Sequence, residues 1–262
     1  MVTTSVAIRV PLAASDMSPH AALTVCGADL VLDLAGTLYW PDESALVVAD
    51  LHLEKGSSFA TRGMLLPPYD TAATLALLGR AVARYAPRLV IALGDSFHDG
   101  DGPARLMADD RGALAGLQRG RDWVWIAGNH DPDPANNIGG VFARSLSLGP
   151  LTFRHEPTLL DGACSSRQTG DHFAGTCAGT ADGEIAGHLH PSARVSQRGR
   201  AVTCKCFAAD AHRMVMPAFG AYTGGLNIRD RAFAKVFARA FTAHLIGDKR
   251  LYAFAAARCL PG

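Results

Sequence analysis

Five apolar, strand-like runs in this chain each end in side chains that can bind a metal ion or transfer a proton. They read LVVADLH, VIALGDSFH, WIAGNHD, LTFRHE and EIAGHLH, and in chain order they carry Asp50, His52, Asp95, His98, Asn129, His130, Asp131, His155, His188 and His190. In α/β sheets, ligands bind where strands end, because loops there project side chains over a rigid floor. The repeated pattern therefore predicts one site assembled from distant parts of the chain.

The glycines beside these endings strengthen that prediction. Gly94, Gly128 and Gly187 each come directly before a polar residue, where a missing Cβ allows a tight turn and a close approach of the backbone to a bound group. A single histidine, by contrast, is usually an ordinary core or surface residue. The histidines outside the five runs keep that interpretation: His20, His172, His212 and His244.

The first half of the chain predicts alternating strands and helices. Strands are expected at residues 29–34, 36–40, 45–50, 88–95 and 122–129, and helices at 69–86 and 103–118. Leu75, Leu78 and Val82 recur at helical spacing, and Pro87 closes that helix. Because the strands from residue 45 onward are almost entirely apolar, we expect a sheet that helices cover on both faces.

The second half of the chain is richer in strands, which predicts a second sheet packed on the first. Strands are expected at residues 145–155, 184–188, 193–197, 200–208 and 212–219, followed by a helix at 229–240 and terminal strands within 242–256. The stretch 156–182 is rich in small and polar residues without periodicity, which predicts a loop insertion. Residues 1–22 indicate a loosely ordered leader, and 23–262 a single domain.

Composition narrows the function classes. The formal net charge is +1, so no global basic field indicates a polyanionic partner. The N-terminus lacks the features of a signal peptide and no window is long enough to span a membrane, so we expect a cytoplasmic protein without a membrane partner. The six cysteines are expected to be free thiols. Irregular spacing disfavours a zinc site built from Cys164, Cys177, Cys204 and Cys206.

The donors at the strand ends are carboxylates, imidazoles and one amide, a set that suits manganese, iron or zinc. Seven groups exceed what one catalytic ion needs: Asp50, His52, Asp95, Asn129, His155, His188 and His190. We therefore expect two divalent ions about 3.5–4 Å apart, bridged by one carboxylate, as in sites that hydrolyse phosphoesters. Asp95, on the central strand of the early unit, is the candidate bridge.

These blocks resemble the five signature motifs of the calcineurin-like metallophosphoesterases over roughly residues 45–220. The resemblance implies an α/β fold, a four-layer α/β/β/α sandwich of two mixed sheets. It also implies that Asp50, His52 and His190 hold one metal, that Asn129, His155 and His188 hold the other, and that Asp95 joins both. His130 corresponds to the catalytic histidine of the family, which is not a metal ligand.

The segments ADLHLEKG, LGDSFHDG, GEIAGHLHP and MPAFGAYTGGLN are similar to those of the bacterial ligase-associated DNA damage response endonucleases. This narrower resemblance implies a Mn²⁺-dependent nuclease of DNA repair that acts on single-stranded DNA. It also implies functional links to a ligase, a helicase or a nuclease, and leaves a homodimer open. Where phosphoprotein phosphatases of this fold have an Asp-Arg pair, this chain has His98 and Asp99. Orientation of His130 would then fall to Asp99, to Asp131 or to no carboxylate.

Catalysis is expected to depend on His130, which would protonate the leaving alkoxide, together with Asp131. Arg62, in the segment FATRGMLLPP, and His98 are the candidate substrate contacts. Further cations that could line the rim of the cleft, or simply lie on a solvated surface, are Lys55, Arg105, Arg111, Arg119, Arg121, Lys205 and Arg213. Two alternatives stay open at this point, namely a phosphodiesterase or phosphatase for small nucleotides and a non-catalytic scaffold that binds proteins.

Overall fold

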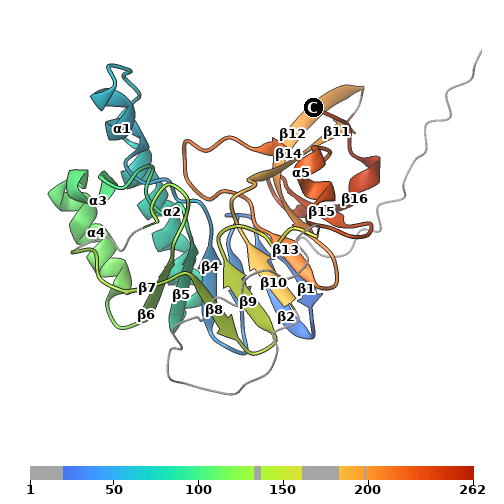
Figure 1. Cartoon of the computed structure of the whole chain (residues 1–262), viewed down its shortest axis with the longest axis horizontal. Helices are drawn as coiled ribbons and strands as arrows, with labels where there is room; N and C mark the ends of the chain where they lie inside the picture. The colour runs from blue at the N-terminus through green and yellow to red at the C-terminus, as the bar shows by residue number, and fades with distance from the viewer. Residues whose placement is uncertain (1–19, 133–136, 161–182, 198) are drawn as a thin grey trace, which may run out of the picture.

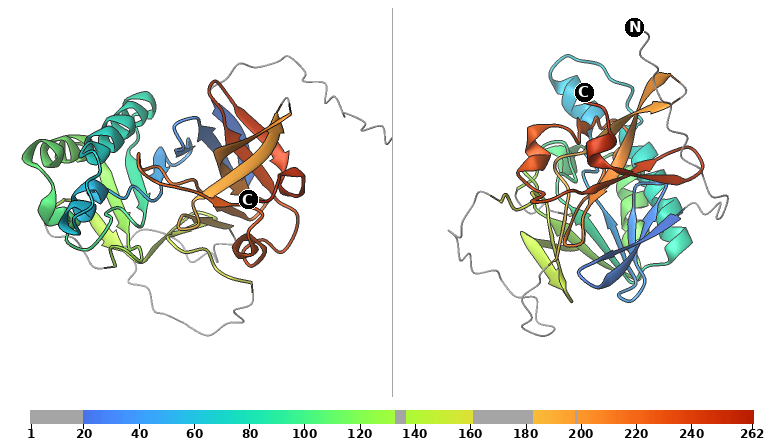
Figure 2. Two further views of the ribbon diagram at one scale, coloured as in Figure 1. Left: turned by 90° about the horizontal axis from the view of Figure 1, so that it is seen from above. Right: turned by 90° about the vertical axis from the view of Figure 1, so that its right-hand side faces the viewer.

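The structure is a computed structural model that describes residues 20–132, 137–160, 183–197 and 199–262. Two mixed sheets pack against each other, and most of the helices lie together outside the first sheet (Figure 1). Seen from above, the helices, the two sheets and the C-terminal elements follow one another across the molecule (Figure 2). This arrangement agrees with the predicted α/β fold of two mixed sheets.

The first sheet has seven strands in the order in which they occur in the chain. They are β1 (His20–Val25), β2 (Ala28–Asp33), β3 (Leu38–Trp40), β4 (Ala45–Val48), β5 (Leu89–Leu93), β6 (Asp122–Ile126) and β7 (Val141–Ala143). β1 to β4 pair antiparallel, and β4 to β7 pair parallel. Every residue of β4 and β5 is buried, as expected for strands that are covered on both faces.

The second sheet has nine strands, seven of them in the order β14-β11-β12-β13-β10-β9-β8. The strands are β8 (Ser145–Leu148), β9 (Leu151–Arg154), β10 (Gly183–Ala186), β11 (Pro191–Gln197), β12 (Arg200–Ala209), β13 (Arg213–Val215), β14 (Leu226–Asn227), β15 (Thr242–Ile246) and β16 (Leu251–Ala255). The long β12 pairs with β11 along its first part and with β13 and β15 at its end. It thereby connects the centre of the sheet to the β15–β16 hairpin.

The helices are α1 (Lys55–Thr61), α2 (Asp70–Tyr85), α3 (Gly102–Arg105), α4 (Ala108–Gln118), α5 (Arg231–Ala234) and the 3₁₀ turn η1 (Ala256–Arg258). Three apolar cores join the layers. One lies between the sheets and includes Ile91 and Phe153, and a second joins the first sheet to α2 and α4. The third covers the outer face of the second sheet and includes Phe233 of α5. On this outer face, the helical layer of the sandwich is represented by the short helix α5.

Two expected helices differ from the structure. The helix expected at 103–118 is broken into α3 and α4, because Leu106 and Met107 adopt extended backbone angles and the Leu106 side chain enters the core. The helix expected at 229–240 is only the four-residue α5. Its apolar spacing is real, but Arg213 binds the carbonyl of Val236, an acceptor that a continuing helix would use.

Other expectations fall partly outside the described residues. Most of the expected leader, 1–22, lies outside them, but its last three residues, 20–22, belong to β1. The expected insertion, 156–182, is described only as far as residue 160. In the part of the chain that the structure describes, no helix combines the length and apolar composition needed to cross a membrane.

Candidate metal centre

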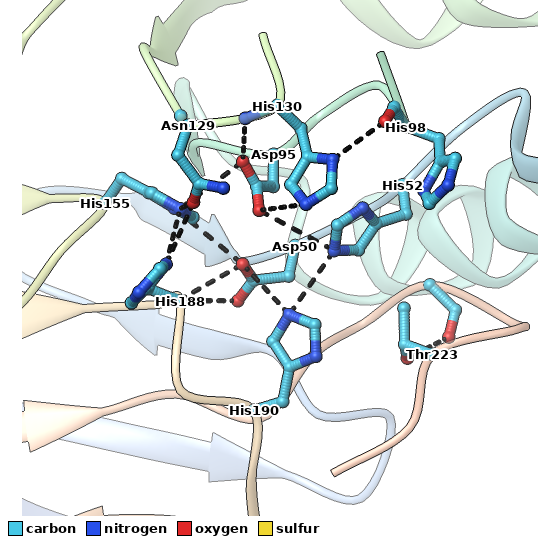
Figure 3. A network of polar contacts seen from close by, with 12 residues as sticks. Asp50, His52, Asp95, His98, Asn129, His130, His155, His188, His190 and Thr223 are labelled. Carbon is cyan, nitrogen blue, oxygen red and sulfur yellow. Dashed lines mark hydrogen bonds and ion pairs between the residues drawn. The ribbon is translucent and has the colours of Figure 1, made fainter. Parts of the chain in front are cut away.

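The seven expected metal ligands come together where five strands end (Figure 3). Asp50 and His52 follow β4, Asp95 follows β5 and Asn129 follows β6. His155 follows β9 of the second sheet, and His188 and His190 follow β10. Because these strands run parallel within each sheet and the two sheets face each other, residues separated by up to 138 positions become neighbours.

One group of donors consists of Asp50, His52 and His190, whose ligand atoms lie within 4.8 Å of one another. The Nε2 atom of His190 is 3.3 Å from Oδ1 of Asp50. The Nε2 atoms of His52 and His190 face each other at 3.3 Å. Asp50 is fully buried, and its carboxylate accepts the backbone N–H of His188. These three side chains could hold one divalent ion.

A second group consists of Asp95, His155 and His188, joined by the amide of Asn129. The Nε2 atom of His155 is 3.4 Å from Oδ1 of Asp95. Oδ1 of Asn129 lies 2.9 Å from Nε2 of His155 and 3.0 Å from Nδ1 of His188. The donors are imidazole nitrogens and carboxylate or amide oxygens, which suit zinc, iron or manganese.

Asp95 lies between the two groups. Its Oδ1 atom is 3.4 Å from His155 in the second group, and its Oδ2 atom is 3.8 Å from Nε2 of His52 in the first. A backbone N–H from His130 also donates to Oδ1 at 2.9 Å, which fixes the carboxylate. One oxygen therefore faces each group, an arrangement that suits a bridging carboxylate.

Charges in the cluster are balanced within the chain. Burial opposes protonation of His155, but the hydrogen bond to Asp95 and the charge of Asp50 raise its pKa to about 9. Burial lowers the pKa of His52 to about 3, although Asp95 acts in the opposite direction. For Asp95, burial is outweighed by His155 and by the N–H of His130, and its pKa falls to about 2. Buried carboxylates beside inward-facing imidazoles fit a divalent cation, whose charge would take the place of the charge on the His155 imidazolium.

The backbone is strained at the same places. Five candidate ligands have positive φ angles between 44° and 69°: Asp50, His52, Asp95, His188 and His190. Such angles are uncommon for residues other than glycine and cost free energy, and they cluster at functional sites. In this chain these backbone conformations direct the side chains at the ends of β4, β5 and β10 toward one another.

Two of the glycines noted in the sequence are required by close packing in the site. A Cβ at Gly128 would lie 2.1 Å from the backbone nitrogen of Asp95. A Cβ at Gly94, where φ is +70°, would lie 2.5 Å from the ring of His155. Both glycines therefore allow the strand ends to approach as closely as the donor groups need.

His130 is positioned by the backbone of His98. The Nδ1 atom of His130 lies 2.9 Å from the carbonyl oxygen of His98, and the two rings stack with centroids 5.3 Å apart. The Nε2 atom of His130 faces the cluster, 3.9 Å from Oδ2 of Asp95. His52, His98 and His130 form a third group whose ligand atoms lie within 4.8 Å of one another.

The carboxylates expected to orient His130 have other partners. Asp131 accepts the backbone N–H groups of Ser96, Phe97 and Gly128, so it joins the loops after β5 and β6. Burial raises the pKa of Asp131 to about 6, against the effect of these hydrogen bonds. Asp99 binds Arg105 at 2.7 Å. Of the three options for orienting His130, namely Asp99, Asp131 or no carboxylate, the contacts of the described residues favour the last. The Nδ1 atom of His130 pairs with the His98 carbonyl, a contact for which a sequence carries no side-chain signal.

The α1 side of the centre carries His98, Phe59 and Lys55. The rings of Phe59 and His98 are 5.5 Å apart, and the Lys55 ammonium lies 5.9 Å from the Phe59 centroid. Arg62 is at the C-terminal end of α1, and Lys55 and Arg62 both lower the pKa of His98 after the larger effect of burial. These groups form a cationic and aromatic wall beside His130.

Several cations considered for the rim bind the protein itself. Lys205 donates to the carbonyls of Ala218 and Gly220 and to the hydroxyl of Thr223. The other such cations donate to backbone carbonyls or to side chains: Arg105, Arg111, Arg121 and Arg213. These cations therefore have partners within the protein.

The chain is similar to known proteins in sequence and in structure. Residues 44–159 match the family model of the calcineurin-like phosphoesterases, which includes Asp50 to His155 but not His188 and His190. The crystal structure of the nuclease MPE from Pseudomonas putida is similar, with 28% sequence identity and a TM-score of 0.63, covering 90% of this chain and 100% of that chain.

The similarity to a second solved structure is weak, with a TM-score of only 0.30. It is to a conserved uncharacterized protein, a predicted phosphoesterase, from Streptococcus pneumoniae TIGR4, with 13% identity over 80% of this chain and 96% of that chain. No curated protein matches the chain.

Proposed function

This chain belongs to the calcineurin-like phosphoesterases, and from that premise we propose that it is a nuclease that hydrolyses phosphodiester bonds of DNA with two divalent metal ions. The observation that carries the proposal is the pair of donor groups that share Asp95. The similarity to a nuclease structure, which covers the entire length of that nuclease, supports nucleic acid as the substrate of this chain.

The proposed ligands follow the two groups. Asp50, His52 and His190 would hold one ion, and Asn129, His155 and His188 the other, with Asp95 as ligand to both. Two ions at such a site supply an activated water as the nucleophile and offset charge on the phosphoryl oxygens. We assign Mn²⁺ to both positions, and iron or zinc would suit the same donors.

The chain's own residues would position the substrate and handle the proton. The His98 carbonyl accepts the N–H at Nδ1 of His130, which leaves Nε2 facing the cluster. A proton carried on Nε2 can pass to the leaving oxygen when the phosphorus–oxygen bond breaks. Arg62 and His98 lie on the side to which that leaving group would depart, and they would contact it.

The biological part of the proposal rests on the resemblance of the motifs. It assigns the chain to DNA repair in the cytoplasm, with single-stranded DNA as substrate and functional links to a ligase, a helicase or another nuclease. A small-nucleotide phosphodiesterase with the same metal centre is the alternative that the experiment must separate.

A manganese-dependent assay tests the proposal. The purified chain is compared with Asp95→Asn on single-stranded DNA, duplex DNA, cyclic nucleotides and mononucleotides. We expect cleavage of single-stranded DNA that requires both Mn²⁺ and Asp95. Turnover of cyclic nucleotides or mononucleotides without DNA cleavage would establish the alternative, and no turnover of any substrate would refute both.

A further inference from the structure

A cavity of about 270 Å³ opens directly beside His188. One wall is the segment that follows β9, including Glu156, Pro157 and Leu159, and the opposite wall is α5 with Arg231 and Lys235. His188 is also a candidate ligand of the second donor group. The cavity therefore borders the candidate metal centre at His188, on the side of the second sheet.

Hydrogen bonds hold the two walls together. The N–H of Leu160 donates to the carbonyl of Lys235 at 2.8 Å. The Arg213 guanidinium donates to the carbonyl of Thr158 at 2.6 Å and to that of Val236 at 2.9 Å, so it spans both walls. The N–H of Thr158 is in turn bound by Glu184 at 2.6 Å. These bonds make the cavity a preformed feature of the fold.

The lining combines an apolar surface with cations. Leu159 leaves 48% of its surface exposed, and it lines the cavity together with Pro157 and Leu189. Arg231 and Lys235 are exposed. Of the two acidic residues in the lining, Asp230 accepts the N–H of Ala232 at the start of α5, while Glu156 faces the cavity beside His188. An apolar wall suits a nucleobase, and the two cations suit a phosphate.

Size limits the occupant to one nucleotide. The volume is slightly below the range of about 300–1,000 Å³ that is typical of sites for drug-sized ligands, so a base with its sugar would fit and a duplex would not. His188, which lines the cavity, lies at the opposite end of the cluster from His98, the residue on which His130 stacks (Figure 3). A leaving group that takes its proton from His130 therefore departs away from the cavity.

We propose that this cavity is the subsite for the nucleotide that keeps the phosphoryl group, with Arg231 and Lys235 binding the next phosphate along the strand. The inference rests on the proposed function. In the hydrolysis, the oxygen of water bonds to phosphorus, the bond from phosphorus to the leaving oxygen breaks, and that oxygen takes up a proton. The retained nucleotide stays beside His188 with its new phosphomonoester at the metal centre.

Binding of product analogues tests the subsite separately from catalysis. Isothermal titration of the Mn²⁺-loaded full chain compares thymidine 3′,5′-bisphosphate with the two thymidine monophosphates. The bisphosphate can place one phosphate at the metals and the other at Arg231 and Lys235, whichever strand polarity the site accepts. We expect it to bind about tenfold more tightly than either monophosphate, a difference of about 1.4 kcal/mol.

The double variant Arg231→Ala/Lys235→Ala should lose most of that preference. Its matched control is Arg239→Ala/Lys249→Ala, which removes the same charge from exposed positions outside the cavity. This control should keep the preference for the bisphosphate over the monophosphates. The exchange Arg231→Lys/Lys235→Arg should restore binding, since both cations are kept. Melting temperatures of the variants show whether each is folded.

The outcomes separate the two proposals. Equal affinities for bisphosphate and monophosphates, or an unchanged preference in Arg231→Ala/Lys235→Ala, would overturn the subsite even if DNA cleavage is found. A wild-type chain that hydrolyses neither DNA nor bis(p-nitrophenyl) phosphate would instead overturn the proposed function, whatever the titration shows.

Discussion

The Nδ1 atom of His130 lies 2.9 Å from the backbone carbonyl oxygen of His98. A carbonyl accepts only, so the proton of a neutral His130 ring is on Nδ1 and the free electron pair is on Nε2. Protonation of Nε2 then gives an imidazolium that faces Asp95 at 3.9 Å. In this chain a backbone carbonyl thus orients His130, which agrees with the option that no carboxylate does so.

His130→Ala should reduce turnover far more than metal binding, because no donor in the two metal groups is removed. On DNA, whose leaving alkoxide needs a proton, we expect kcat to fall about 10²–10⁴-fold. On bis(p-nitrophenyl) phosphate, whose leaving group is stable without a proton, the loss should be much smaller. Equal losses on both substrates would show that His130 does not act as the acid.

Asp95→Asn should lose both metal and turnover, since Asp95 faces one donor group with each of its two oxygens. Added Mn²⁺ should raise the melting temperature of the wild-type chain, because the donors converge only in the folded state. The variant should show a much smaller rise. Metal content by mass spectrometry and melting with and without chelator measure the two effects, and a wild-type rise in the variant would argue against a bridging role.

Gly128→Ala should destabilise the fold and weaken metal binding together. The new Cβ would meet the backbone nitrogen of Asp95 at 2.1 Å, which cannot give way as a flexible side chain would. Overpacking of this kind costs about 1–3 kcal/mol. Gly112→Ala in α4 is the control, since no atom lies within 4 Å of its Cβ position, and it should stabilise the helix by about 0.5–1 kcal/mol. Thermal unfolding checks both.

Lys205→Met should lower stability, because the Lys205 ammonium joins the carbonyls of Ala218 and Gly220 to the hydroxyl of Thr223. Leaving buried acceptors without a donor costs about 1–3 kcal/mol. Lys249→Met, at an exposed position, should change the melting temperature little. If Lys205 instead served as a phosphate contact, its loss would weaken DNA binding while melting stayed unchanged.

His244 should make the fold sensitive to acid. It is buried in β15, its Nε2 atom has no hydrogen-bond partner among the described residues, and burial lowers its pKa from the ordinary value of 6.5. As the pH falls, His244 therefore binds a proton in the unfolded chain before it does so in the folded chain. The free energy of unfolding is highest above pH 6.5 and decreases below it.

The measurement for His244 is the fall in melting temperature between about pH 8 and about pH 5. His244→Gln cannot titrate in this range, and its melting temperature should fall less than that of the wild type. The histidines of the metal centre titrate in both proteins, so the difference isolates His244. Parallel curves for the two proteins would contradict the prediction.

Local sequence patterns were sufficient for the fold class and for the types of donor. Helix α2 and strands β4 and β5 follow from apolar spacing within a few residues, and such short-range patterns are readable without a partner segment. The seven donors could be recognised because each follows an apolar run. Where a local pattern competes with a long-range contact it fails, as at Val236, whose carbonyl Arg213 binds.

The sequence by itself determined which side chains end the strands and therefore that carboxylates, imidazoles and an amide would meet. Only the tertiary structure decided that the carbonyl of His98 positions His130, that Lys205 stabilises a loop, and that α5 lines a cavity beside His188. The physical reason is that these relationships depend on the order and register of two sheets and on backbone groups. Every residue has a backbone carbonyl, so contacts to carbonyls cannot be recognised from the pattern of side chains.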